Sequence, residues 1–200
     1  DNGLVLPPAI APIQAVIIPI AMHKPGVTEK AQELEAALKA AGIRVKCDLS
    51  EQSPGWKFSE YEMRGVPVRI EVGPRDIEKG TCVVACRDNS EKTTVALDEL
   101  ANVVSGLMTA VRDRMYEKAL ARRNAMTYTA TTQEELAEIV KDKQGFVKMM
   151  WCGDEACEDA IKEKYGVGTR CIPFEQEHLS DKCVCCGKPA KHLVYWGKAY

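Results

Sequence analysis

The hydrophobic positions in the first part of the chain alternate between strand and helix patterns. Residues 15–20 form a continuous apolar run, which is typical of a strand buried on both faces. Apolar residues at helical spacing follow, with Thr28 as the expected N-cap and Gly42 as the stop, and residues 43–49 then alternate as a second strand. This order predicts a parallel pair of strands joined by a right-handed crossover.

Shorter patterns extend this first unit. They predict a helical piece at 56–64, an alternating strand at 66–72 and a turn at 73–76. A two-stranded hairpin at 81–97 and a long helix from about 98 onward follow. The end of the long helix is rich in arginine and lysine, which suits a helix C-terminus and a solvated face. We therefore expect an α/β unit with a mixed sheet and flanking helices.

Near Tyr128 the pattern starts again. Thr132 and Glu135 form a capping box that opens a helix closed by Gly145. The segments that follow predict a strand at 146–151, a helix at 155–165 and two further strands at 169–174 and 191–196. The chain is thus expected to have three parts: an extended, proline-containing linker at 1–14, a first domain at 15–127 and a small α/β domain at 128–200.

The second domain carries an unusual concentration of cysteine. Six of the nine cysteines fall between Cys152 and Cys186, as Cys152-x4-Cys157, then Cys171, then Cys183-Val184-Cys185-Cys186-Gly187. Two cysteine pairs about thirty residues apart, without a paired histidine, favour a closed tetrahedral Zn²⁺ site with a structural role. In the second pair, Cys183 with Cys186 forms a zinc knuckle, and Cys185 then points away, but the spacing leaves the choice among the three open.

Other uses of these cysteines are less well supported. Disulfides require a secreted chain and leave one of the nine cysteines unpaired. A thiol oxidoreductase using Cys183 to Cys186 is a third class of function, which bound zinc would exclude. The four remaining cysteines lie in strand-like or apolar runs and are expected to be small buried residues: Cys47, Cys82, Cys86 and Cys171.

Composition and charge argue against several classes of function. The chain is 46% hydrophobic and 28% charged, as expected of a globular protein, and its net charge of −2 argues against binding nucleic acid through bulk charge. The longest apolar stretch, residues 10–22, is interrupted by prolines and is too short to span a bilayer. No signal peptide is visible, so we expect a protein of the reducing cytoplasm without a membrane partner. Because the first residue is Asp1 and not methionine, we also expect the chain to be a fragment.

One strand and its following turn carry candidate chemistry for reading nucleic acid. In the Arg69-Ile70-Glu71 strand and the Gly73-Pro74-Arg75-Asp76 turn, arginine and carboxylate side chains alternate with apolar ones, so that one face is polar. Arginine forks donate to guanine O6 and N7, and carboxylates accept from its Watson–Crick edge when a base is splayed from a single-stranded loop. An ordinary solvent-facing strand with ion pairs is the alternative. Three aromatic residues close in sequence either stack bases or belong to the core: Trp56, Phe58 and Tyr61.

Three separated segments resemble the prolyl-tRNA synthetase family. Residues 1–8 resemble the stretch that leaves the catalytic domain, and Pro54-Gly55-Trp56-Lys57-Phe58 with Gly65-Val66-Pro67 and Glu71-Val72-Gly73-Pro74-Arg75-Asp76 resembles the anticodon-binding domain. The cysteine set with Lys198-Ala199-Tyr200 resembles the carboxy-terminal zinc domain. The resemblance covers the whole chain and is to the archaeal and eukaryotic-like type.

This resemblance implies a specific fold and specific partners. The fold would be a mixed five-stranded sheet with flanking helices, the class IIa anticodon-binding fold, followed by a small α/β zinc-binding domain. The partners would be tRNA(Pro), the catalytic domain of the same full-length chain, and a second copy in a homodimer. The parent would be a proline–tRNA ligase whose ATP and Mg²⁺ are bound by a catalytic domain upstream of Asp1, so the chain alone is expected to be inactive.

Residue roles carried over from the family are as follows. Reading of the two guanines of the proline anticodon is assigned to Glu62, Arg69 and Asp76, with Arg75 as a neighbouring possibility. The zinc ligands are Cys152, Cys157, Cys183 and Cys186, with Cys185 still a possible replacement. The terminal Tyr200 would contact the catalytic domain. The competing function is a zinc-bearing protein-interaction module that reads no RNA.

Overall fold

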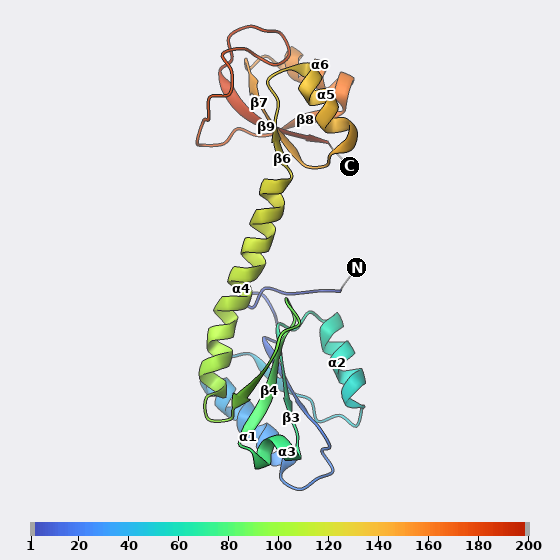
Figure 1. Cartoon of the computed structure of the whole chain (residues 1–200), viewed down its shortest axis with the longest axis vertical. Coiled ribbons are helices and arrows are strands. Elements are labelled where there is room, and N and C mark those ends of the chain that lie inside the picture. Colours follow the sequence, from blue (N-terminus) through green and yellow to red (C-terminus); the bar gives the residue numbers. More distant parts are fainter. Residues whose placement is uncertain (1–2, 199–200) are drawn as a thin grey trace. The chain divides into compact units, whose positions relative to one another are not determined.

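The computed structural model describes residues 3–198, which form two compact units divided between Glu117 and Lys118. Each unit has its own sheet and its own hydrophobic core. The boundary between them falls within the long helix α4 (Leu100–Ala125), which Figure 1 shows in yellow-green. The two units are described separately below.

The first unit is built on the mixed five-stranded sheet that the sequence predicts. The strand order is β2-β1-β3-β4-β5, in which β1 is parallel to β2 and β3, and the pairs β3–β4 and β4–β5 are antiparallel. The strands are Ala15–Pro19, Val45–Cys47, Val68–Val72, Thr81–Cys86 and Lys92–Ala96. All five residues of β1 are buried, which confirms the expectation from its unbroken apolar run.

Alternation along β1 divides the core of this unit between the two faces of the sheet. Ile17 points to the face where Leu38 of α1 and Val104 of α4 pack, whereas Val16 and Ile18 point to the face covered by Tyr61 of α2. The helices of this unit besides α4 are α1 (Val27–Ala40), α2 (Pro54–Met63) and α3 (Pro74–Glu78). The side chains of β3 that alternate with Val68 and Ile70 therefore lie on the α2 face.

Two local predictions in this unit are wrong. Helix α1 begins at Val27, and its N-cap is Gly26 in the left-handed conformation (φ 81°), not Thr28. Gly73 to Asp76 is not a simple turn, because Pro74 opens the short helix α3 and the Asp76 side chain accepts a hydrogen bond from the Gly73 N–H (2.9 Å). Proline at the first helical position suits a helix start, since its missing N–H would have no partner there.

The second unit contains a four-stranded sheet with two helices. Its strand order is β6-β7-β9-β8, with β6 parallel to β7 and the other pairs antiparallel. The elements are β6 (Thr127–Thr129), α5 (Gln133–Asp142), β7 (Phe146–Trp151), α6 (Glu155–Tyr165), β8 (Val167–Cys171) and β9 (His192–Lys198). Its core contains Leu136 of α5, Met149 of β7, Ile161 of α6 and the fully buried Trp196 of β9.

The start of α5 agrees with its prediction, but the end does not, because the helix ends at Asp142 with Lys143 as its C-cap and not at Gly145. The capping box of Thr132 and Glu135 is present, as predicted. Gly145, in the connection to β7, has a φ of 129°, and a Cβ there would lie 2.0 Å from the Met126 carbonyl oxygen. Only glycine fits this close approach of two backbone segments.

The end of β8 differs from its prediction. The strand covers Val167–Cys171, not residues 169–174, and a register irregularity interrupts its pairing with β9 between Thr169 and Cys171. Because the strand lies at the edge of the sheet and stops there, Cys171, Ile172 and Phe174 are exposed. The expectation that Cys171 is buried is therefore wrong, whereas Cys82 and Cys86 are buried and Cys47 is partly buried.

Candidate nucleic-acid interface and metal centre

Arg69 lies at the centre of the first candidate site. It is on β3, on the face that α2 covers, and its side chain is largely buried. Its guanidinium carbon lies 4.1 Å from the ring centroid of Phe58, which α2 contributes. Helix α2 is started by Ser53, whose hydroxyl accepts a hydrogen bond from the Trp56 N–H (3.3 Å). The cap thus helps to place the aromatic ring against the guanidinium, an arrangement that favours a cation.

Two carboxylates bind the Arg69 guanidinium from different elements. Glu62 of α2 accepts from Nη1 (2.7 Å), and Glu71 of β3 accepts from Nε (3.1 Å). The same Glu71 oxygen accepts from Nζ of Lys92 on β5 (3.1 Å). Charge-assisted bonds of this kind hold a side chain in one orientation. The structure therefore brings two of the four predicted anticodon-reading residues, Glu62 and Arg69, into direct contact.

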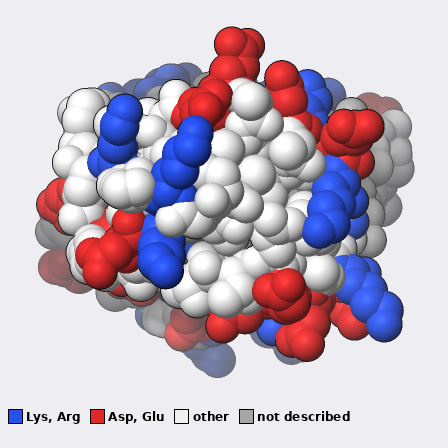
Figure 2. All heavy atoms as spheres, turned by 90° about the horizontal axis from the view of Figure 1, so that it is seen from above, with Lys and Arg blue, Asp and Glu red and all other residues white. Residues whose placement is uncertain are grey.

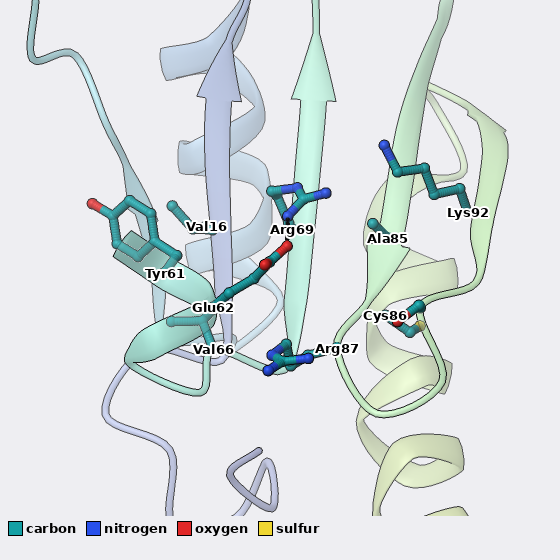
Figure 3. A pocket seen from close by; sticks show the side chains of 10 residues that line it. Val16, Tyr61, Glu62, Val66, Arg69, Ala85, Cys86, Arg87 and Lys92 are labelled. Carbon is teal, nitrogen blue, oxygen red and sulfur yellow. Dashed lines mark hydrogen bonds and ion pairs between the residues drawn. The ribbon is translucent and has the colours of Figure 1, made fainter. Parts of the chain in front are cut away.

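The Arg69 side chain borders a hollow of about 200 Å³ on this face of the sheet (Figure 3). Register places Val16, Arg69, Ala85 and Lys92 in one row across four adjacent strands. The small side chain of Ala85 separates the two cations of the row. Apolar groups and charged groups both line the hollow: Val16, Tyr61, Val66 and Ala85 with Glu62, Arg69, Arg87 and Lys92.

The other two predicted RNA-reading residues lie on a different element. Arg75 and Asp76 belong to α3, after the carboxyl end of β3, and neither lines the hollow. Arg75 is exposed, and Asp76 is half-buried because one of its oxygens caps the helix. The structure therefore does not bring the four predicted residues into one cluster, but presents two pairs at the two ends of one strand.

Two polar residues of this site, Glu71 and Lys92, have no role assigned by the sequence. The alternation of β3 already indicated that Glu71 shares the face of Arg69. Nothing in the local pattern around Lys92 showed that it would lie in the same row, because that depends on the register of β4 with β3 and β5. Phe58, in contrast, was noted as either a stacking or a core residue, and here it stacks on Arg69.

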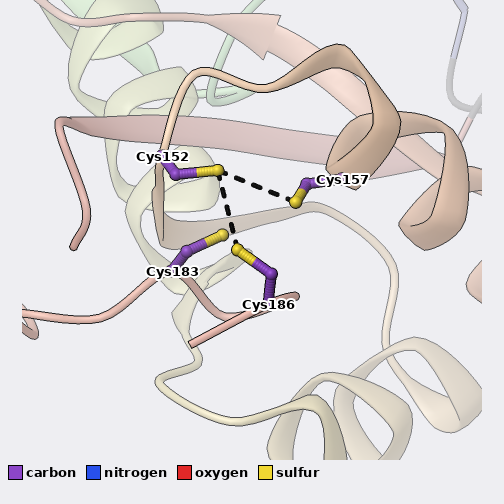
Figure 4. A group of neighbouring side chains, drawn as sticks. All are labelled: Cys152, Cys157, Cys183 and Cys186. Atoms are coloured by element: carbon purple, nitrogen blue, oxygen red, sulfur yellow. Dashed lines mark hydrogen bonds between the residues drawn. The ribbon is translucent and has the colours of Figure 1, made fainter. Parts of the chain in front are cut away.

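The second candidate site is the group of four cysteines. Cys152 follows β7, Cys157 lies in the first turn of α6, and Cys183 and Cys186 lie in the segment before β9 (Figure 4). Their sulfur atoms all lie within 4.8 Å of one another, with 3.7 Å between Cys152 and Cys157 and 3.8 Å between Cys152 and Cys186. These are the four predicted ligands.

This geometry fits a four-coordinate metal ion. Tetrahedral bonds of about 2.3 Å from zinc to thiolate place the sulfur atoms roughly 3.8 Å apart. Cys185 packs against the cluster but is not one of the four, so the structure favours Cys186 over Cys185 as the last donor. Four thiolates complete a tetrahedron and leave no position for a substrate, which points to a structural and not a catalytic metal.

The pKa values of three of these thiols are shifted in different directions. Burial raises the pKa values of Cys152 and Cys157, whereas the backbone N–H of Lys188 is the main cause that lowers the pKa of Cys186 to about 7. A divalent cation would stabilise all four thiolates, because coordination deprotonates a thiol outright. The donor set therefore fits a divalent metal that binds thiolates.

Hydrogen bonds support the segment that carries the last two thiols. The Cys183 N–H donates to the Lys188 carbonyl (2.8 Å), and the Gly187 N–H donates to the Cys183 carbonyl (3.0 Å). Gly187 has a φ of 70°, which favours glycine in this tight turn. From α5, Gln133 Nε2 donates to the Cys185 carbonyl (3.1 Å), while its own oxygen accepts from the Tyr165 hydroxyl (3.0 Å).

Both the charge distribution and the hydropathy of the helices can be followed in part of the structure. On the face that Figure 2 shows, acidic and basic side chains are interspersed around a central region without charge. Within residues 3–198, none of the helices is both long and apolar enough to cross a membrane. Tyr200, predicted to contact a catalytic domain, lies outside the described residues.

Comparison with known proteins identifies both domains of the chain. Residues 14–107 match the family model for the anticodon binding domain, and residues 133–200 match that for the C-terminal part of prolyl-tRNA synthetase. The whole chain is 58% identical to proline–tRNA ligase of Clostridium botulinum (strain Loch Maree / Type A3) and 57% identical to that of Lachnospira eligens. The chain therefore contains an anticodon-binding domain followed by a prolyl-tRNA synthetase C-terminal domain.

The match to these prolyl-tRNA synthetases covers all of the chain but only part of the relatives. Proline–tRNA ligase 2 of Bacillus cereus is 54% identical over the same 200 residues. In each of the three relatives the chain spans 42% of the length. The mixed five-stranded sheet is the anticodon-binding fold of this synthetase class, as predicted. The chain thus matches the non-catalytic anticodon-binding and C-terminal region of these relatives.

Proposed function

We propose that the chain selects tRNA(Pro) for a proline–tRNA ligase by reading its anticodon. The relatives are named proline–tRNA ligases, and the chain contains the anticodon-binding domain of that family. The full-length protein would attach proline to tRNA(Pro) with ATP and Mg²⁺ bound by its catalytic domain. Binding energy from the remote anticodon then helps to place the acceptor end for reaction. Residues 15–127 would form the anticodon-binding domain.

The observation that carries this function is the way Arg69 is held at the edge of the hollow. Phe58 stacks on its guanidinium, and Glu62 accepts from Nη1. In this role Arg69 donates to O6 and N7 of one anticodon guanine, and Glu62 accepts from the Watson–Crick edge. Arg75 and Asp76 form a second pair of the same chemistry on α3, which suits the other guanine.

Binding of a proline tRNA transcript tests this function. Replacing the two anticodon guanines by adenines should weaken binding to the chain, and Arg69→Ala should remove the preference for guanine. Arg112→Ala is the matched control, because this exposed arginine lies on α4 and pairs with Asp113. Equal affinity of the unmodified chain for both transcripts would contradict base reading and favour the zinc-bearing protein-interaction module.

For the four cysteines we infer structural zinc, within a C-terminal domain of residues 128–200. Support comes from the thiol-only donor set and its spacing. This domain would present Tyr200 to the catalytic domain, and the full-length protein would form a homodimer in the cytoplasm. A terminal zinc domain also favours the archaeal and eukaryotic-like type, which some bacteria carry. Elemental analysis should find one zinc per chain, and four reactive thiols without metal would instead support a thiol oxidoreductase.

A further inference from the structure

Glu71 is a charged side chain to which neither the fold nor base reading by Arg69 and Glu62 assigns a role. Its side chain is only 15% exposed, and one of its oxygens binds two cations, Arg69 Nε and Lys92 Nζ, each at 3.1 Å. Burial of a carboxylate is costly unless it is paired and hydrogen-bonded. Glu71 meets that requirement because it accepts hydrogen bonds from both cations. These bonds connect β3 to β5 next to the row of residues that lines the hollow.

The contacts of Arg69 show what Glu71 does to it. Phe58 fixes the plane of the guanidinium, and Glu71 fixes its rotation within that plane by binding Nε. Glu62 binds Nη1 but is itself 47% exposed and lies on a different element. Glu71 is on the same strand as Arg69, two residues away, so it is the better-anchored partner. Among the described residues, the recorded bonds of Arg69 use Nε and one N–H of Nη1, which leaves the other N–H of Nη1 and both of Nη2 to donate elsewhere.

We propose that Glu71 is a positioning residue for base reading, which orients the Arg69 guanidinium without touching the base itself. This inference rests on the proposed role of Arg69 in reading guanine. An arginine that keeps one orientation presents its donors at the spacing of O6 and N7, whereas a freely rotating one binds phosphates and bases alike. Discrimination between bases, more than affinity, therefore depends on Glu71.

A simple charge effect predicts a different result for the same substitution. Removing a carboxylate from an RNA-binding face raises the local positive charge and should tighten binding to every transcript. Loss of a positioning group should instead bring the affinities for guanine and adenine transcripts together. The ratio of the two affinities separates these alternatives.

The test measures dissociation constants of the 200-residue chain for proline tRNA transcripts with guanine or adenine at the anticodon positions. The unmodified chain should prefer guanine by roughly 5- to 150-fold, the range for one good bidentate contact. Glu71→Ala should reduce this ratio at least severalfold. Glu71→Gln should keep part of it, because the amide oxygen can still accept from Nε. Glu91→Ala, which removes an exposed carboxylate that accepts a hydrogen bond from Asn89 Nδ2, should leave the ratio unchanged.

Separate outcomes identify which idea is wrong. If Arg69→Ala retains the preference for guanine, base reading by Arg69 is wrong. If Arg69→Ala abolishes the preference but Glu71→Ala retains it, or tightens binding to both transcripts equally, only the positioning role is wrong. Circular dichroism and thermal melting of each variant establish that it is folded, and Glu71→Gln decides the matter if Glu71→Ala does not fold.

Discussion

Lys57 Nζ lies 3.6 Å from Asp48 Oδ1 and donates a hydrogen bond to the Asp48 carbonyl oxygen at 2.9 Å. The lysine side chain is 1% exposed, and Asp48 is also buried. The pair connects the first half of α2 to the segment after β2. Since α2 also carries Phe58 and Glu62, this buried ion pair anchors the helix that contributes to the proposed RNA-reading site.

Breaking this pair from one side should destabilise the first unit. Lys57→Met leaves the Asp48 carboxylate buried without its cation, which costs about 3–5 kcal/mol. Hydrogen exchange of the β1 amides measures the change in the first unit alone. Lys30→Met, which removes the partner of the exposed Glu33, should change exchange little. Adding Asp48→Asn to Lys57→Met should recover part of the loss, and a double variant less stable than the single one would contradict this account.

The Asp48 carboxylate should make the first unit sensitive to acid. Burial disfavours its ionised form, but the hydrogen bonds from Ser50, with the charge of Lys57, outweigh burial and lower its pKa. Because the pKa of Asp48 is lower in the folded than in the unfolded chain, its ionised carboxylate stabilises the fold at pH values above the unfolded-state pKa of about 4. This stabilisation is lost as the pH falls through the folded-state pKa. The difference in unfolding free energy between the unmodified chain and Asp48→Asn should therefore shrink below about pH 4. A difference independent of pH would contradict this.

Removing zinc should unfold the second unit and spare the first. The two units have separate cores, and the four cysteines join β7, α6 and the segment before β9. A chelator should therefore abolish the hydrogen-exchange protection of β7 and β9 amides while β1 remains protected. Cys152→Ser should behave like chelation, and Cys171→Ser is the matched control because Cys171 lies outside the group. Protection of β7 that resists the chelator would rule out a structural metal.

Thiol labelling should follow exposure, acidity and metal binding. With zinc bound, a small alkylating reagent at pH 7.5 should modify the exposed Cys171 first. Burial, with the charges of nearby carboxylates, raises the pKa of both Cys47 and Cys82 to about 11, so these thiols should remain unmodified. Chelation should then expose the four ligands. Mass spectrometry identifies the labelled sites, and early labelling of Cys82 would contradict the arrangement of the first core.

Gln133 should influence how firmly the metal is held. It connects the Cys185 carbonyl to Tyr165 and so supports the turn that carries Cys186. Groups that orient metal ligands from outside typically change metal affinity by about 10- to 100-fold when removed. Gln133→Ala should therefore release zinc to a chromogenic chelator faster than the unmodified chain. Gln144→Ala, at an exposed position, should not alter the release rate.

Several features of this protein were determined by sequence alone. The apolar run at β1, the capping box of Thr132 with Glu135 and the cysteine pairs all depend on near neighbours in the chain. A strand buried on both faces needs an unbroken apolar run, and a helix start needs an acceptor side chain at a set spacing. The paired arrangement of the thiols likewise follows from spacing, because each pair sits on one short segment.

Other features were decided only by the tertiary structure. Arg69 and Lys92 share a row because β3, β4 and β5 pair in one register, and Cys171 is exposed because β8 is an edge strand that ends there. The register of distant strands depends on packing of the whole sheet, and the side chain that a residue meets across it is not encoded near that residue. Glu71 therefore acquires its two cationic partners only when the sheet has formed.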